Sequence, residues 1–194
     1  MAGQYDGIQT TKTFSYLFSG AERALVLADK TLEGQFYHVM NCLILQAFTV
    51  EAYFNHLLYG PEEISWDLKF KSERPSVWEK YREISRNLSG AKIDLTDAHP
   101  QVAAILYFRN SLAHGETESI EVSEILSSND LPHTASEVQF PSWMHFCILK
   151  NAREGLDQTR FLIESTHAQA GLDNYPLSTL GSGSYSFKLL SDIE

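Results

Sequence analysis

The chain has 194 residues, of which 43% are hydrophobic, and a net charge of −10 at neutral pH. This length suits one domain that buries a core without metal or disulfide crosslinks. The acidic charge argues against a protein whose affinity comes mainly from wrapping a nucleic-acid backbone. No secretory leader opens the sequence, and no apolar run approaches the roughly 20 residues of a membrane span. We therefore expect a cytoplasmic protein without a membrane partner.

The cysteine content favours buried thiols in a reducing compartment over a disulfide. Cys42 and Cys147 lie far apart, and both fall inside helical patterns. His38 precedes Cys42 by four positions, which is metal-ligand spacing, but no second pair at matching spacing completes a site. We expect no metal and no cofactor.

Two helices are predicted in the first third of the chain, from apolar residues spaced three or four apart. The first is predicted as an outer helix and contains Phe14, Leu17, Phe18, Ala21, Leu25, Ala28 and Leu32. The second is predicted as the central helix, from about Gln35 to Leu58, with Phe36, Met40, Leu43, Ala47, Val50 and Phe54. A carboxylate, Glu51, and an amide, Asn55, line the edge of its apolar stripe.

A third helix is predicted to begin at Ser76, where Ser76 and Glu79 have capping-box spacing. Its predicted inward positions are Val77, Tyr81, Ile84 and Leu88, and its predicted exposed face holds Lys80, Arg82 and Arg86. Residues 69–92 contain seven Lys or Arg against three Glu, a local excess of +4. This excess could form the phosphate-attracting wall of a cleft; the alternative is an ordinary solvated helix face.

A fourth helix is predicted from His99-Pro100 to a stop at Gly115. Its predicted apolar stripe contains Val102, Ile105, Leu106, Arg109, Leu112 and Ala113. Since an arginine keeps its proton on burial, Arg109 requires a partner, and we predict Glu51. In the alternative arrangement Glu51 extends to solvent.

The remaining chain completes a predicted all-α bundle of about five helices. Six acidic and no basic residues lie between 116 and 137, and the strand signals are confined to 116–140. A fifth helix is predicted from Pro141 to about Thr166, with Met144, Ile148, Ala152, Thr159 and Ile163 on one side. We assign residues 1–170 to one helical domain and 171–194 to a loosely held, Gly/Ser-rich tail.

The end of the fourth predicted helix carries the main chemical signal, Arg109-Asn110-Ser111-Leu112-Ala113-His114. It combines a guanidinium, an amide and an imidazole, a set suited to a phosphodiester. Asn110 and His114 are four positions apart and therefore share one flank of the helix.

At these residues the chain resembles the HEPN family of small helical proteins, which carry an Arg-(Asn/polar)-x-x-x-His motif late in the bundle. Arg109, Asn110 and His114 match the motif. The resemblance implies a bundle that dimerises so that two motifs face one cleft and, in active members, metal-independent RNA cleavage. Some members have a Tyr two positions after the His; here that position is Glu116, so regulation through such a tyrosine is not supported.

The sequence therefore predicts a metal-independent endoribonuclease in which Arg109, Asn110 and His114 are catalytic and Glu51 and Asn55 support them. RNA contacts are assigned to Lys80, Arg82 and Arg86. The predicted partners are single-stranded RNA and a second copy of the chain, with a neutralising protein partner left open. The alternatives are a non-catalytic interaction or regulatory module and a binder of a phosphate or nucleotide ligand.

Overall fold

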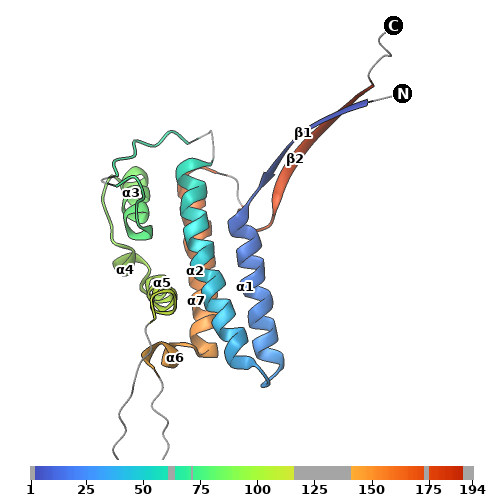
Figure 1. Ribbon diagram of the computed structural model, residues 1–194. Helices are drawn as coiled ribbons and strands as arrows, with labels where there is room; N and C mark the ends of the chain where they lie inside the picture. The colour runs from blue at the N-terminus through green and yellow to red at the C-terminus, as the bar shows by residue number, and fades with distance from the viewer. Residues whose placement is uncertain (1–2, 61–63, 71, 116–140, 173–174, 190–194) are drawn as a thin grey trace, which may run out of the picture.

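The computed structural model describes residues 3–60, 64–70, 72–115, 141–172 and 175–189. This part of the chain is mainly helical (Figure 1), as predicted. The elements in chain order are β1 (Gly3–Thr11), α1 (Thr13–Lys30), α2 (Gln35–Tyr59), α3 (Val77–Ser89), α4 (Leu95–Ala98), α5 (Pro100–Ala113), α6 (Ser142–Phe146), α7 (Leu149–Gln169) and β2 (Gly181–Leu189). Within the same residues, none of the helices combines the length and the apolar character that crossing a bilayer requires.

The centre of the bundle is α2, which contacts α1, α3, α5 and α7. It lies between α1 on one side and α3 and α5 on the other (Figure 1). The predicted stripe of α2 is buried at Leu43, Ala47, Val50 and Phe54. The central position predicted for this helix is therefore confirmed.

A glycine allows α7 to approach α2 and α5 closely. A Cβ on Gly155 would lie 2.4 Å from Cδ1 of Ile105 and 2.5 Å from Oε1 of Gln46. The Gln46 side chain is fully buried and donates from Nε2 to the Ala152 carbonyl at 2.8 Å. A larger residue at position 155 would displace this packed contact.

The start of α3 has the capping box that its sequence predicts. Ser76 Oγ accepts from the Glu79 backbone N–H at 3.3 Å, and Glu79 Oε2 accepts from the Ser76 N–H at 2.8 Å. The helix ends at Gly90, whose φ of 79° is in the left-handed region that favours glycine. These local signals set the bounds of α3, which packs against α2.

The prediction of one continuous helix from Pro141 was wrong, because the chain breaks between α6 and α7. Cys147 (ψ 61°) and Ile148 (ψ 152°) leave the helical conformation. Cys147 is a free, buried thiol, as Cys42 is, so the predicted burial of both side chains is confirmed. With the short helices α4 and α6, the described residues form seven helices where five were predicted.

The prediction that strands are confined to 116–140 was also wrong. Residues 116–140 lie outside the described part of the chain, whereas β1 and β2 pair antiparallel, from Thr11 opposite Gly181 to Gly3 opposite Leu189. Nine residues of the segment predicted to be loosely held, Gly181–Leu189, therefore form a strand of a ribbon that extends away from the bundle (Figure 1). Its Gly/Ser composition resembles a linker, and the partner strand lies at the other end of the sequence, so local patterns did not indicate it.

Candidate functional site

The motif spans the end of α5, from Arg109 to the C-cap residue His114. Pro100 is the first residue of this helix and His114 is its C-cap, close to the predicted bounds. Ala113 was predicted on the apolar stripe but is exposed, because the last turn of α5 extends beyond the core. Gly115 follows the helix without a positive φ. Its Cβ would lie 2.8 Å from the Ser111 carbonyl oxygen, so close approach favours glycine there.

The predicted pairing of Arg109 with Glu51 is present. Arg109 Nη2 donates to Glu51 Oε2 at 2.7 Å, and the guanidinium lies 5.7 Å from the ring centroid of Phe48. The side chains of Arg109 and Glu51 are 21% and 35% exposed. The pair is half-buried, so its loss would cost less than the removal of one partner from a fully buried pair.

Lys80 belongs to the same cluster, and its predicted exposure was wrong. The residue is only 8% exposed, and its Nζ lies 4.0 Å from Glu51 Oε1. Position 80 is one turn after Val77 and next to Tyr81, both buried, and this spacing was the available signal for an inward orientation. Two cations therefore share one carboxylate.

One donor of the Arg109 guanidinium has no acceptor. Its Nε is buried and lacks a hydrogen-bond partner among the described residues. A buried donor left unsatisfied costs about 1–3 kcal/mol. With the shared carboxylate, this unpaired donor makes the cluster electropositive and short of acceptors.

Asn110 and His114 lie beside this cluster in the sequence but are not tied into it. Asn110 is half-buried and His114 is exposed. The backbone N–H of His114 donates to the Asn110 carbonyl at 3.0 Å. Within the described residues, neither side chain forms a hydrogen bond or an ion pair. Asn55 is exposed on α2 one turn after Glu51, and no described contact joins it to Arg109.

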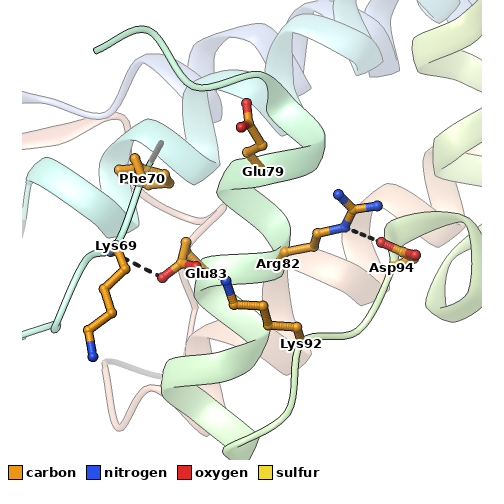
Figure 2. Close-up of a pocket in the computed structure, with 7 residues that line it drawn as sticks. All are labelled: Lys69, Phe70, Glu79, Arg82, Glu83, Lys92 and Asp94. Atoms are coloured by element: carbon orange, nitrogen blue, oxygen red, sulfur yellow. Dashed lines mark hydrogen bonds and ion pairs between the residues drawn. The ribbon is translucent and has the colours of Figure 1, made fainter. Parts of the chain in front are cut away.

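The basic face of α3 borders a separate recess of about 440 Å³ (Figure 2). It is lined by Lys69, Phe70, Glu79, Arg82, Glu83, Lys92 and Asp94. Figure 2 shows Arg82 joined to Asp94, and Lys92 Nζ lies 2.8 Å from Glu83 Oε1. Three acidic residues thus balance three cations in this lining, which contains none of the motif residues.

Glu83 is the centre of the α3 charge cluster and was not singled out from the sequence. It is 3% exposed and accepts from Arg86 Nη2 at 2.7 Å and from the Lys69 backbone N–H at 3.2 Å. Burial by itself would raise the pKa of this carboxyl, but the hydrogen bonds from Lys92, Arg86 and Lys69 outweigh it and lower the pKa. Arg86 is therefore already paired, and Arg82 is the exposed member of the three predicted RNA contacts.

Comparison with protein-family models, curated proteins and solved structures finds no match to this chain.

Proposed function

We propose that this chain is a metal-independent endoribonuclease with an HEPN-like helical bundle, acting as a cytoplasmic homodimer on single-stranded RNA. One observation carries the proposal: the Arg109 guanidinium is held by Glu51, keeps a buried Nε without a partner among the described residues, and lies five positions before an exposed imidazole at the end of the same helix. Phosphate oxygens are acceptors that a guanidinium binds well.

In the proposed reaction His114 is the general base. It accepts the proton of a 2′-OH while the 2′-oxygen attacks the adjacent phosphorus. The bond from phosphorus to the 5′-oxygen then breaks, leaving a 2′,3′-cyclic phosphate and a 5′-OH. Arg109 offsets the charge that develops on the phosphoryl oxygens, with Lys80 adding positive charge nearby. Asn110 orients the phosphate or the imidazole.

A second copy completes the proposed site. Arg109 and His114 are five positions apart, which corresponds to about 140° around a helix at about 100° per residue. A cleft on a two-fold axis would bring each His114 toward the other copy of the motif. In this arrangement the partner subunit's His114 protonates the departing 5′-oxygen, so one imidazole acts as base and the other as acid.

The test is cleavage of single-stranded RNA in EDTA by the full chain and by His114→Ala and Arg109→Ala. His38→Ala and Arg153→Ala are matched controls, since His38 lies on α2 and Arg153 on α7. We expect a loss of about 10²- to 10⁴-fold in the first two variants and wild-type activity in the controls. Products ending in 2′,3′-cyclic phosphate support the mechanism. Wild-type activity in His114→Ala, or no cleavage by the wild-type chain, overturns it.

A second candidate is a non-catalytic interaction module or a binder of a phosphate or nucleotide ligand. The observation that favours it is the 2.7 Å contact with Glu51, which already neutralises much of the Arg109 charge. RNA or nucleotide binding without cleavage in the same assay would support this candidate.

A further inference from the structure

The β1–β2 ribbon is the part of the described structure least covered by other elements. Residues 4–11 and 181–188 are all exposed, and the ribbon extends away from the helices (Figure 1). In the described residues the sheet contains these two strands alone, so both outer edges are open. Because an isolated two-stranded sheet is marginally stable in water, such a ribbon gains stability from a partner.

The two faces of the ribbon differ in chemistry. Residues directly opposite in the register share a face, which groups Tyr5 with Phe187 and Gly7 with Tyr185. All three aromatic residues are exposed: Tyr5 and Phe187 to 64% each and Tyr185 to 53%. The opposite face is mostly hydroxyl and amide side chains, with Ile8 as its apolar member. We call the first the aromatic face.

Two glycines make the aromatic face flat. A Cβ on Gly7 would lie 2.2 Å from Cδ1 of Tyr185, and one on Gly183 would lie 2.8 Å from its hydroxyl. The Tyr185 ring therefore lies across both glycines and stacks on Tyr5 at 5.5 Å. Its hydroxyl donates to Gln9 Oε1 at 3.2 Å. The rings are thus ordered before any partner arrives, which reduces the entropy cost of binding.

The charge distribution identifies the kind of partner. The two strands contain one acidic residue, Asp6, and one basic residue, Lys188, both on the face opposite the aromatic rings. The net charge of −10 therefore lies entirely outside the strands. Nucleic-acid stacking surfaces combine rings with a basic groove, and the aromatic face has no Lys or Arg. Edge strands that avoid association usually carry charged residues or proline. The two strands of this ribbon contain two charged residues and no proline.

We propose that the aromatic face is an interface between two copies of this chain, packed ribbon against ribbon about a two-fold axis. The aromatic face carries no charged side chain, so two such faces meet without burying an unpaired charge. A two-fold axis makes one surface its own complement, so no other component is needed. The interface is separate from the Arg109 site and does not depend on the proposed nuclease activity.

The available area predicts a weak dimer. A fully buried aromatic side chain covers about 150–250 Å², so the three partly exposed rings offer roughly 300 Å² per ribbon. Two ribbons then bury roughly 600 Å² of ring surface, below the roughly 1,200 Å² typical of a stable complex. Association through this face is therefore reversible and concentration-dependent.

The test is sedimentation velocity of the full chain over a wide concentration range. The variant is Tyr5→Ser with Phe187→Ser, and the matched control is Ile8→Ser, which removes a side chain that is 73% exposed on the opposite face. We expect the wild type and Ile8→Ser to shift from monomer to dimer as concentration rises, with association at least about tenfold weaker in the double variant. A wild-type chain that stays monomeric, or a double variant that dimerises as the wild type does, overturns the proposal.

Two further measurements keep the result interpretable. Far-ultraviolet circular dichroism of the double variant should equal that of the wild type, which checks that its helices are retained. His114→Ala is expected to dimerise as the wild type does. Loss of RNA cleavage in that variant is then distinguishable from loss of the ribbon interface. A benzoylphenylalanine placed at Phe187 should crosslink to Tyr5 or Tyr185 of a second copy in a mixture of isotopically labelled and unlabelled chains. Crosslinks confined to the same chain, or to helical residues of the second copy, overturn the ribbon interface.

Discussion

The carboxylates of Glu51 and Glu83 each pair with basic side chains, but they differ in how many hydrogen-bond donors they accept. Glu83 is 3% exposed and accepts hydrogen bonds from Arg86 and the Lys69 backbone N–H, with Lys92 Nζ at 2.8 Å. The side chain of Glu51 is 35% exposed, with one donor at 2.7 Å and Lys80 Nζ at 4.0 Å. The first carboxylate is saturated, and the second is not.

The arginines of the two clusters also differ in how many hydrogen bonds they donate, although their side chains are equally exposed. The side chains of Arg86 and Arg109 are both 21% exposed. Arg86 uses Nε and Nη2 on Glu83, at 3.0 and 2.7 Å, whereas Arg109 uses Nη2 on Glu51 and leaves Nε unpaired. Arg86 thus bonds its carboxylate through two nitrogen atoms, while Arg109 bonds its own through one and keeps a buried donor unsatisfied.

The largest expected effect on stability is that of Glu83→Gln. The substitution leaves Arg86 and Lys92 without their shared carboxylate in a buried position, so we expect a loss of about 3 kcal/mol in the free energy of unfolding. Urea denaturation measures it, with exposed Glu73→Gln as the control. A loss similar to that of the control would remove the distinction between the clusters.

Glu51→Gln should cost less, about 1 kcal/mol, because the pair is more exposed and the amide oxygen can still accept from Arg109. The same change should increase affinity for a short RNA, because it removes a negative charge beside the guanidinium. Denaturation and fluorescence anisotropy measure the two effects. Destabilisation as large as that of Glu83→Gln, or weaker RNA binding, would contradict the comparison.

Lys80→Met should change the unfolding free energy by less than about 1 kcal/mol. The ammonium is buried and only loosely paired at 4.0 Å, so a similar-sized apolar side chain offsets what is lost. If Lys80 acts on RNA phosphate, the slope of log affinity against log salt should decrease in magnitude by about 0.7. An unchanged slope would restrict Lys80 to a structural role.

The smallest effect expected is a decline in stability on mild acidification, arising from His56 and His99. Burial lowers the pKa of both imidazoles, and Lys12 lowers that of His56 further. Between these lowered pKa values and the unfolded pKa of about 6.5, the unfolded chain binds more protons than the native one. The contribution of the two histidines to the free energy of unfolding is therefore fully present above about pH 6.5 and is lost as the pH falls through their pKa values in the folded chain. Denaturation from about pH 7 to about pH 5.5 measures the decline, and His56→Gln with His99→Gln should flatten it.

Glu83 acts in a lower pH range. Its carboxyl has a lowered pKa in the folded chain, so its contribution to the free energy of unfolding is lost only below about pH 4.5.

The sequence predicted those helices whose position and bounds are set by neighbouring residues in the chain. Heptad-like spacing of apolar residues identified α2, and a cap residue with its reciprocal glutamate identified the start of α3. The Glu51–Arg109 pair was predictable for a different reason: each is a charged group at an apolar helix position and requires a partner.

Contacts that depend on how helices are placed were not predictable in the same way. Glu83 collects donors from Arg86, Lys92 and the Lys69 backbone N–H, and two of these donors lie outside α3, in the 64–70 segment and after the helix. The helical pattern of α3 alone could have indicated that Lys80 faces inward, but it could not indicate these partners. The break at Cys147 and the pairing of β1 with β2 are likewise set by tertiary contacts. The roles of Arg109, Asn110 and His114 in catalysis, and of RNA and a second copy as partners, stay predictions.

The way the ribbon is attached to the helices has a consequence for the order of folding. The Lys12 N–H donates to the Leu180 carbonyl at 2.9 Å, and Ser15 Oγ donates to the Pro176 carbonyl at 2.9 Å. These contacts join the start of α1 to the segment after α7, and before they form the two strands are separated by almost the whole chain. Since closing so long a loop is slow and entropically costly, strand pairing should follow helix assembly, and hydrogen exchange should report the latest protection in Gly3–Thr11 and Gly181–Leu189.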